Sequence, residues 1–232
     1  MSESVISVII PFYNASTFFE ECILSVLNQE KVNIEIIVVD DGSSASEKKF
    51  ISIQQDKYGF KLIHQENKGV SAARNTGLFE VKGDRVLFLD ADDELEHNAL
   101  YDLIKECSDV VVGNYQTGAK IIMPKLTNQQ FIQGNPIQVG TALIKVAVAR
   151  QVGGFNESLA YSEDMDFWFR MWKMDAKFMQ VNHCVLNYRI HEHSSMKKKS
   201  KRLYDDNALS LMYRYVNSKN IYACEDWFNK AI

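Results

Sequence analysis

Short runs of β-branched residues alternate with helix-like segments through the first half of the chain. The runs at residues 5–10 and 34–39 are almost continuously apolar, which is typical of parallel strands buried on both faces. Between them, apolar residues recur at helical spacing over residues 15–29. The same patterns predict strands at 61–64, 85–89 and 110–112 and helices at 70–79 and 95–107. This alternation predicts an α/β fold with a mostly parallel central sheet flanked by helices.

The second half of the chain has a less regular pattern. Residues 114–138 are polar, contain two of the three prolines and include a candidate hairpin at 120–123. This segment is therefore the only candidate boundary. Beyond it the pattern predicts helices at 144–152, 163–173 and 203–216 and a strand at 184–190. We expect a smaller second subregion built on the regular first half.

Length, composition and charge limit the class of protein. The 232 residues are 46% hydrophobic and 24% charged, as in globular proteins, and allow one large domain or two small ones. A net charge of -4 and a pI near 5.8 argue against a general nucleic-acid binder, whose pI usually exceeds ~9. No apolar run approaches the ~20 residues of a membrane span, so we expect a cytoplasmic protein.

Several common chemistries leave no signature in the sequence. No G-x-x-x-x-G-K-[ST] loop and no G-x-G-x-x-G follows a predicted strand, which disfavours P-loop hydrolysis and dinucleotide redox chemistry. The cysteines are dispersed without a C-x-x-C pair, so we expect buried thiols rather than a disulfide framework or a zinc site. They are Cys22, Cys107, Cys184 and Cys224.

Acidic residues follow the predicted strands, where ligands of open α/β sheets bind. Asp40 and Asp41 follow the strand at 34–39, and Asp90, Asp92 and Asp93 follow the strand at 85–89. Three neighbouring carboxylates repel unless they are solvated, protonated or bridged by a cation. Mg²⁺ or Mn²⁺ bound by carboxylates, water and phosphate oxygens would resolve this repulsion. The alternative is a solvated turn that caps the next helix.

Three further segments carry candidate chemistry. Arg74 lies inside the helix that follows Gly69, where plain helix packing is the alternative. Asp164 lies in the first turn of the helix predicted at 163–173. There it either interacts favourably with the helix dipole or, with a raised pKa, acts as a general base. His191 precedes a basic run from Lys197 to Arg202, which is either a solvated loop, a phosphate-neutralising patch or a contact with anionic lipid.

Five motifs in this order resemble the family 2 glycosyltransferases of GT-A fold. They lie at residues 8–14 (VIIPFYN), 38–43 (VVDDGS), 67–75 (NKGVSAARN), 88–93 (FLDADD) and 162–164 (SED). The resemblance runs from Val5 to about Ser195. It implies a GT-A-type, Rossmann-like sandwich formed by one domain over 1–232, with a nucleotide-sugar-binding half at 1–112 and an acceptor-binding half at 113–232.

The resemblance also implies roles for the donor-side residues. Pro11 and Tyr13 would line the nucleobase pocket, Asp41 would contact the base, and Arg74 would lie near the diphosphate. The segment Asp90-Ala91-Asp92 matches the family's DxD motif. Its first acid, Asp90, would approach the ribose, with Ala91 beside it. Asp92, with help from Asp93, would hold the divalent cation, Mn²⁺ or Mg²⁺.

On the acceptor side, Asp164 would be the catalytic base, and His191 would contact the metal, with His193 as an alternative. The Q/R-x-x-R-W motif of processive synthases is absent, and residues 167–172 (FWFRMW) follow instead. This difference favours transfer of a single sugar.

The implied reaction is metal-dependent and inverting, with a UDP-sugar as the expected donor and a β product from an α-linked donor. The implied acceptor is a glycan or lipid-linked saccharide of bacterial surface polysaccharide synthesis, met at the inner face of the membrane. A sugar nucleotidyltransferase and a non-catalytic nucleotide-sugar-binding module are the alternatives. The identity of the sugar stays open, as does continuation of the native chain past Ile232.

Overall fold

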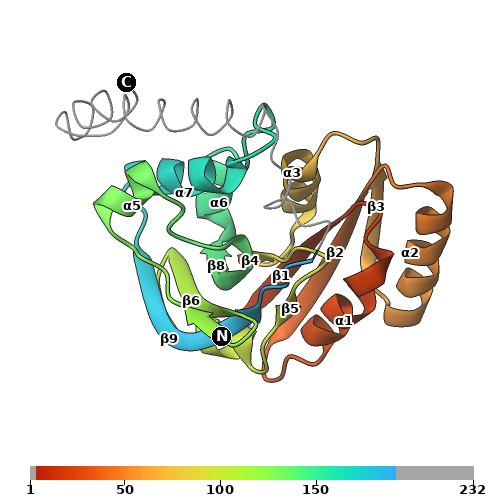
Figure 1. The fold of residues 1–232 in the computed structure, drawn as a ribbon, viewed down its shortest axis with the longest axis horizontal. Helices are drawn as coiled ribbons and strands as arrows, with labels where there is room; N and C mark the ends of the chain where they lie inside the picture. The colour runs from red at the N-terminus through yellow and green to blue at the C-terminus, as the bar shows by residue number, and fades with distance from the viewer. Residues whose placement is uncertain (1–3, 192–232) are drawn as a thin grey trace.

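The computed structural model describes residues 4–191, which form a nine-stranded sheet with helices packed on it (Figure 1). The strands are β1 (Val5–Phe12), β2 (Asn33–Asp41), β3 (Lys61–Gln65), β4 (Arg85–Phe88), β5 (Glu94–Leu95), β6 (Val110–Thr117), β7 (Lys120–Ile122), β8 (Ala142–Lys145) and β9 (Phe178–Asn187). The helices are α1 (Ser16–Leu27), α2 (Ala45–Tyr58), α3 (Val70–Glu80), α4 (Ala99–Ile104), α5 (Asn128–Gln133), α6 (Val146–Gln151), α7 (Glu163–Lys173) and the 3-10 turn η1 (Val139–Thr141). The sheet order is β3-β2-β1-β4-β8-β6-β9-β5, with β7 paired to β6.

The sheet has a parallel part and a mixed part. Strands β3, β2, β1 and β4 are all parallel, and Phe12 at the end of β1 pairs with Asp40 near the end of β2. The carboxyl ends of these strands therefore meet at one edge. Strand β8 is antiparallel to both β4 and β6, whereas β6 and β9 are parallel. The predicted α/β class is confirmed, and the all-parallel part of the sheet is formed by β1, β2, β3 and β4.

Apolar side chains form a core on each face of the sheet. Along β1, Val8 and Ile10 join one cluster and Ile9 joins the other, because successive strand residues point to opposite faces. The first cluster includes buried residues of α1 and α4, and the second includes buried residues of α3, α6 and α7. A Cβ atom on Gly77 would lie 2.5 Å from Ile9 Cγ2, so only glycine lets α3 approach β1 this closely.

Two predicted helix boundaries are wrong. The segment predicted as a helix over 95–107 begins as strand β5, because Leu95 pairs with Leu186 of β9, and the helix is limited to Ala99–Ile104. The segment predicted as a helix over 144–152 begins in β8, where Ile144 pairs with β4 and β6, and α6 starts at Val146.

Other predictions fail or fall outside the described residues. Helix α2 was not predicted, because only Ile51 and Gln54 of its residues are buried, which leaves a weak apolar pattern. Cys22 is buried as expected, whereas Cys107 is exposed, so the expectation of a buried thiol there is wrong. The helix predicted at 203–216, His193, Cys224 and the basic run lie outside residues 4–191. No helix within the described range is long and apolar enough to cross a membrane.

Candidate active site

A cleft of about 650 Å³ lies at the carboxyl ends of β1, β2 and β4. Its far wall comes from residues 138–139, the start of α7 and the chain after β9. All of the predicted site residues except Asp93 line it: Pro11, Tyr13, Asp41, Arg74, Asp90, Ala91, Asp92, Asp164 and His191. The parallel half and the mixed half of the sheet therefore contribute to one cavity.

Asp41 is fixed at the end of β2 by backbone hydrogen bonds. Its Oδ1 accepts from the backbone N–H of Lys68 and its Oδ2 from that of Gly69, both at 2.8 Å. Gly42 adopts a left-handed φ of 73°, and a Cβ atom there would lie 2.6 Å from the backbone nitrogen of Asn67. The turn after β2 and the loop before α3 are thus locked together, with Asp41 on the cleft wall.

Arg74 joins the two sides of the cleft through its guanidinium group. One terminal nitrogen donates to Asp90 Oδ1 at 2.7 Å and the other to Glu163 Oε1 at 2.8 Å. Only 3% of the Arg74 side chain is exposed. Burial disfavours its charge, but Asp90 and Glu163 outweigh that cost and raise the arginine pKa. The resemblance implied that Arg74 lies near a diphosphate, and Glu163 was not among the predicted site residues although it belongs to the motif at residues 162–164.

Asp92 and His191 meet on the cleft wall although they are far apart in sequence. His191 Nε2 lies 2.8 Å from Asp92 Oδ2, and the imidazole packs on the ring of Phe18. The antiparallel pair Glu94–Asn187 brings these flanking residues together. Burial and the neighbouring Asp90 raise the pKa of Asp92, and the hydrogen bond from His191 opposes this rise.

Asp93 lies away from the cleft. Its Oδ1 accepts from the backbone N–H of Arg189 at 3.0 Å, and the residue is 1% exposed. Burial, followed by the charges of Asp90 and Asp92, raises the pKa of Asp93 well above its usual value. This position points to a structural contact between the acidic turn and the chain after β9, and the metal role expected for Asp93 stays a prediction.

Asp92 and His191 are the residues in the cleft that fit a divalent cation. Within residues 4–191 no group of three or more His, Cys, Asp or Glu side chains converges on a metal position. A carboxylate oxygen and an imidazole nitrogen do converge, and Mn²⁺ or Mg²⁺ commonly combines one or two protein ligands with water and substrate phosphates. The donor set therefore fits a cation that is held jointly by protein and substrate.

Asp164 faces the same cleft from the first turn of α7. Asn135 Nδ2 donates to its Oδ2 at 2.6 Å, and the backbone N–H of Met165 lies 2.7 Å from its Oδ1. Burial and the adjacent charge of Glu163 raise the pKa of Asp164 to about 6, while these hydrogen bonds and Arg74 oppose the rise. A carboxylate with this pKa is ionised at neutral pH and is more basic than an ordinary aspartate. Sequence reasoning missed Asn135, which lies in the irregular segment between α5 and η1.

The domain is of the GT-A-type α/β class. Its defining features are the parallel strand ends, the acidic turn after β4 and the carboxylate at the start of α7. The family model "Glycosyl transferase family 2" matches residues 7–141. The chain belongs to glycosyl transferase family 2, as the resemblance of its motifs implied.

Relatives and solved structures agree with this assignment. Glycosyltransferase GlyA of Streptococcus pneumoniae is 41% identical over 115 residues, which cover 47% of this chain and 16% of GlyA. S. aureus TarS in complex with UDP-GlcNAc has a TM-score of 0.75 at 21% identity, covering 93% of this chain and 67% of that structure. Mannosyltransferase PcManGT from Pyrobaculum calidifontis, in complex with GDP-Man and Mn²⁺, has a TM-score of 0.68 at 15% identity. The match covers 100% of this chain and 80% of that structure. The two structures show a shared fold, and this chain spans only a small part of GlyA.

Proposed function

We propose that the protein is a metal-dependent, inverting glycosyltransferase that moves one sugar from a nucleoside-diphosphate sugar to a hydroxyl group. The observation that carries this proposal is the position of Asp164, whose raised pKa suits a general base, in the cleft that Asp41, Arg74 and Asp92 also line. A UDP-sugar is the preferred donor, in line with TarS, although PcManGT is solved with GDP-Man.

The donor side of the cleft supplies binding and orientation. Pro11 and Tyr13 would bound the nucleobase pocket, with Asp41 towards the base and Asp90 towards the ribose. Asp92 and His191 would hold a divalent cation, which when bound stabilises the negative charge that grows on the leaving diphosphate. Arg74 has its terminal nitrogens on carboxylates, so it would hold Asp90 in place and supply a positive field near the diphosphate.

The acceptor side supplies the base. Asp164 would remove the proton of the acceptor hydroxyl as its oxygen attacks the anomeric carbon from the face opposite the diphosphate. Such in-line attack inverts the anomeric centre. The acceptor would be a glycan or a lipid-linked saccharide, and bacterial surface polysaccharide synthesis at the inner membrane face would be its setting.

A non-catalytic nucleotide-sugar-binding module is the second candidate, because binding alone would use the same donor-side residues. A base with a pKa near neutrality favours catalysis over this alternative. A sugar nucleotidyltransferase is less favoured. Such enzymes generally have a glycine-rich basic loop after the first strand, and this chain has residues 11–14 (PFYN) at that position.

The replacement Asp164→Asn tests the proposal. We expect it to lower turnover of the donor by roughly 10²–10⁴, because the amide cannot take a proton, and to leave donor affinity nearly unchanged. Release of UDP or GDP from a panel of UDP- and GDP-sugars with Mn²⁺ is the measurement, and calorimetry gives the affinity. Asp56→Asn, an exposed position on α2, is the matched control. Wild-type turnover in Asp164→Asn would remove the base assignment, and binding without turnover in the wild-type protein would favour the module.

A further inference from the structure

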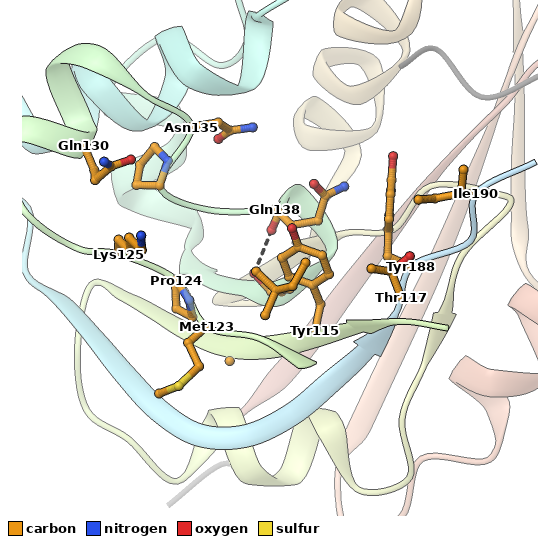
Figure 2. A pocket seen from close by; sticks show the side chains of 14 residues that line it. Tyr115, Thr117, Met123, Pro124, Lys125, Gln130, Asn135, Gln138, Tyr188 and Ile190 are labelled. Atoms are coloured by element: carbon orange, nitrogen blue, oxygen red, sulfur yellow. Dashed lines mark hydrogen bonds between the residues drawn. The ribbon is translucent and has the colours of Figure 1, made fainter. Parts of the chain in front are cut away.

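The chain after β9 runs between two cavities. A second pocket, of about 450 Å³, lies beside the cleft, and Figure 2 shows Tyr188 and Ile190 together on one side of it. Arg189, which stands between them in the chain, does not line this pocket, and His191 lines the cleft. The side chain of Arg189 is 16% exposed and lies against α1 and β5 instead. The arginine therefore faces away from the pocket that its neighbours line.

Strand pairing alone does not bring His191 to Asp92. Glu94 of β5 pairs with Asn187 of β9 in antiparallel register. A regular continuation of this ladder would place Arg189, rather than His191, opposite Asp92. In the structure His191 meets Asp92, so the chain holds two extra residues here. Contacts outside the ladder must fix these residues.

Arg189 supplies such contacts. Its backbone N–H donates to Asp93 Oδ1 at 3.0 Å, which fixes the chain against the acidic turn. Its guanidinium group pairs with Glu21 and Glu94 and lies 5.1 Å from the ring centroid of Phe18. Phe18 and Glu21 are three positions apart on α1, so one face of this helix holds the arginine.

The ring of Phe18 also supports the imidazole. The centroids of the Phe18 and His191 rings are 4.9 Å apart, with an interplanar angle of 40°. His191 Nε2 lies 2.8 Å from Asp92 Oδ2. A guanidinium group is attracted to the face of an aromatic ring, so Phe18 links Arg189 to the imidazole. An imidazole that contacts both a packed ring and a carboxylate has little freedom to turn before a ligand binds.

We propose that Phe18 and Arg189 are positioning residues for the divalent cation, which hold the His191 imidazole in place beside Asp92. Groups that orient a metal ligand without touching the metal commonly raise the affinity for it, because less freedom is lost on binding. The same arrangement gives Asp93 the role of holding the Arg189 backbone. This inference rests on the proposed function, since it requires a cation at Asp92 and His191.

Phe18→Leu in the full chain tests the inference. We expect the affinity for Mn²⁺ in the presence of UDP to fall about tenfold, as when other groups that support a metal ligand are lost. Phe18→Tyr keeps the ring and should bind Mn²⁺ like the wild type. Calorimetric titration measures both. Phe79→Leu is the matched control, because this ring is exposed on α3 and lines neither cavity.

NMR of the metal-free protein gives a readout that does not depend on activity. The ring current of Phe18 should displace the ring-proton signals of His191, which are assigned by their loss in His191→Ala. We expect Phe18→Leu to move these signals and Phe79→Leu to leave them in place. Arg189→Met should also weaken Mn²⁺ binding. Arg150→Met, which loses hydrogen bonds to carbonyl groups at the end of α3, should not.

The outcomes separate this inference from the proposed function. If Phe18→Leu folds and binds Mn²⁺ like the wild type, or if its His191 signals do not move, the positioning assignment is overturned and the proposed function stands. If the wild-type protein binds no Mn²⁺ with UDP or GDP, the metal-dependent function fails and this inference fails with it. Should Phe18→Leu not fold, as judged by thermal unfolding, Arg189→Met takes its place, and an unchanged Mn²⁺ affinity there overturns the assignment.

Discussion

Residues 4–112 and 113–191 hold their functional side chains in different ways. In the first region Asp41 is fixed by two backbone N–H groups, and Asp90 and Asp92 follow directly on a buried strand. In the second, Glu163 is held by the side chain of Arg74, and Asp164 by the side chain of Asn135 and the adjacent backbone N–H of Met165. Asp41 is therefore set mainly by main-chain contacts with the loop before α3, whereas Glu163 and Asp164 depend on side chains from other elements. We expect the contacts that hold Glu163 and Asp164 to be the more sensitive to substitution of a single side chain.

The largest effect should come from removing the guanidinium that joins the two regions. Arg74→Met leaves Asp90 and Glu163 facing each other without a cation, so we expect a loss of about 3 kcal/mol in the free energy of unfolding, as for other broken buried pairs. Urea denaturation measures it. The exposed pair Lys57–Glu20 supplies the control Lys57→Met, which should unfold like the wild type. Equal stability of Arg74→Met and wild type would show that this bridge does not hold the regions together.

An intermediate effect should follow from the residue of the second region that meets Asp92. We expect His191→Ala to lower the affinity for Mn²⁺ in the presence of UDP by roughly 10–100-fold, the range seen when metal-supporting groups are lost. Calorimetric titration of Mn²⁺ measures it. His64 also pairs with an aspartate, at 2.8 Å, but does not line the cleft, so His64→Ala is the control. If His191→Ala left the Mn²⁺ affinity unchanged, the cation would be bound by residues of the first region alone.

The smallest effect concerns the hydrogen bond from Asn135 to Asp164. The base works only when ionised, so activity should fall as the pH drops through about 6. Asn135→Ala removes a donor that favours the ionised form, so the acid limb of the kcat/KM profile should move to higher pH. The groups that remain around Asp164 are Glu163, which raises its pKa, and the backbone N–H of Met165 and the Arg74 guanidinium, which lower it. Asn128→Ala, which removes a hydrogen bond to Trp172, should leave the profile in place. A profile unchanged in Asn135→Ala would mean that Asn135 does not tune the base.

Much of the donor side could be predicted from the sequence, because the relevant acids immediately follow apolar strands. Asp41 and Asp92 needed only the rule that parallel strands end at a common edge. Asn135 and Tyr188 could not be predicted, because they reach the site through tertiary packing of irregular segments. The same limit explains the error at Leu95, whose partner, Leu186, lies 91 residues away. Helix α2 escaped detection because it buries so little of its surface.

The pairing of β5 with β9 has a consequence for how this site can change in evolution or by design. Asp92 stands two residues before Glu94, and His191 stands four residues after its partner Asn187. Whether the two side chains meet therefore depends on the number of residues between each of them and the Glu94–Asn187 pair. A single-residue deletion between Asp92 and Glu94, or between Asn187 and His191, would shift one partner relative to this pair and separate the two side chains. In a library of variants, insertions and deletions in these two short segments should be eliminated more strictly than most substitutions there.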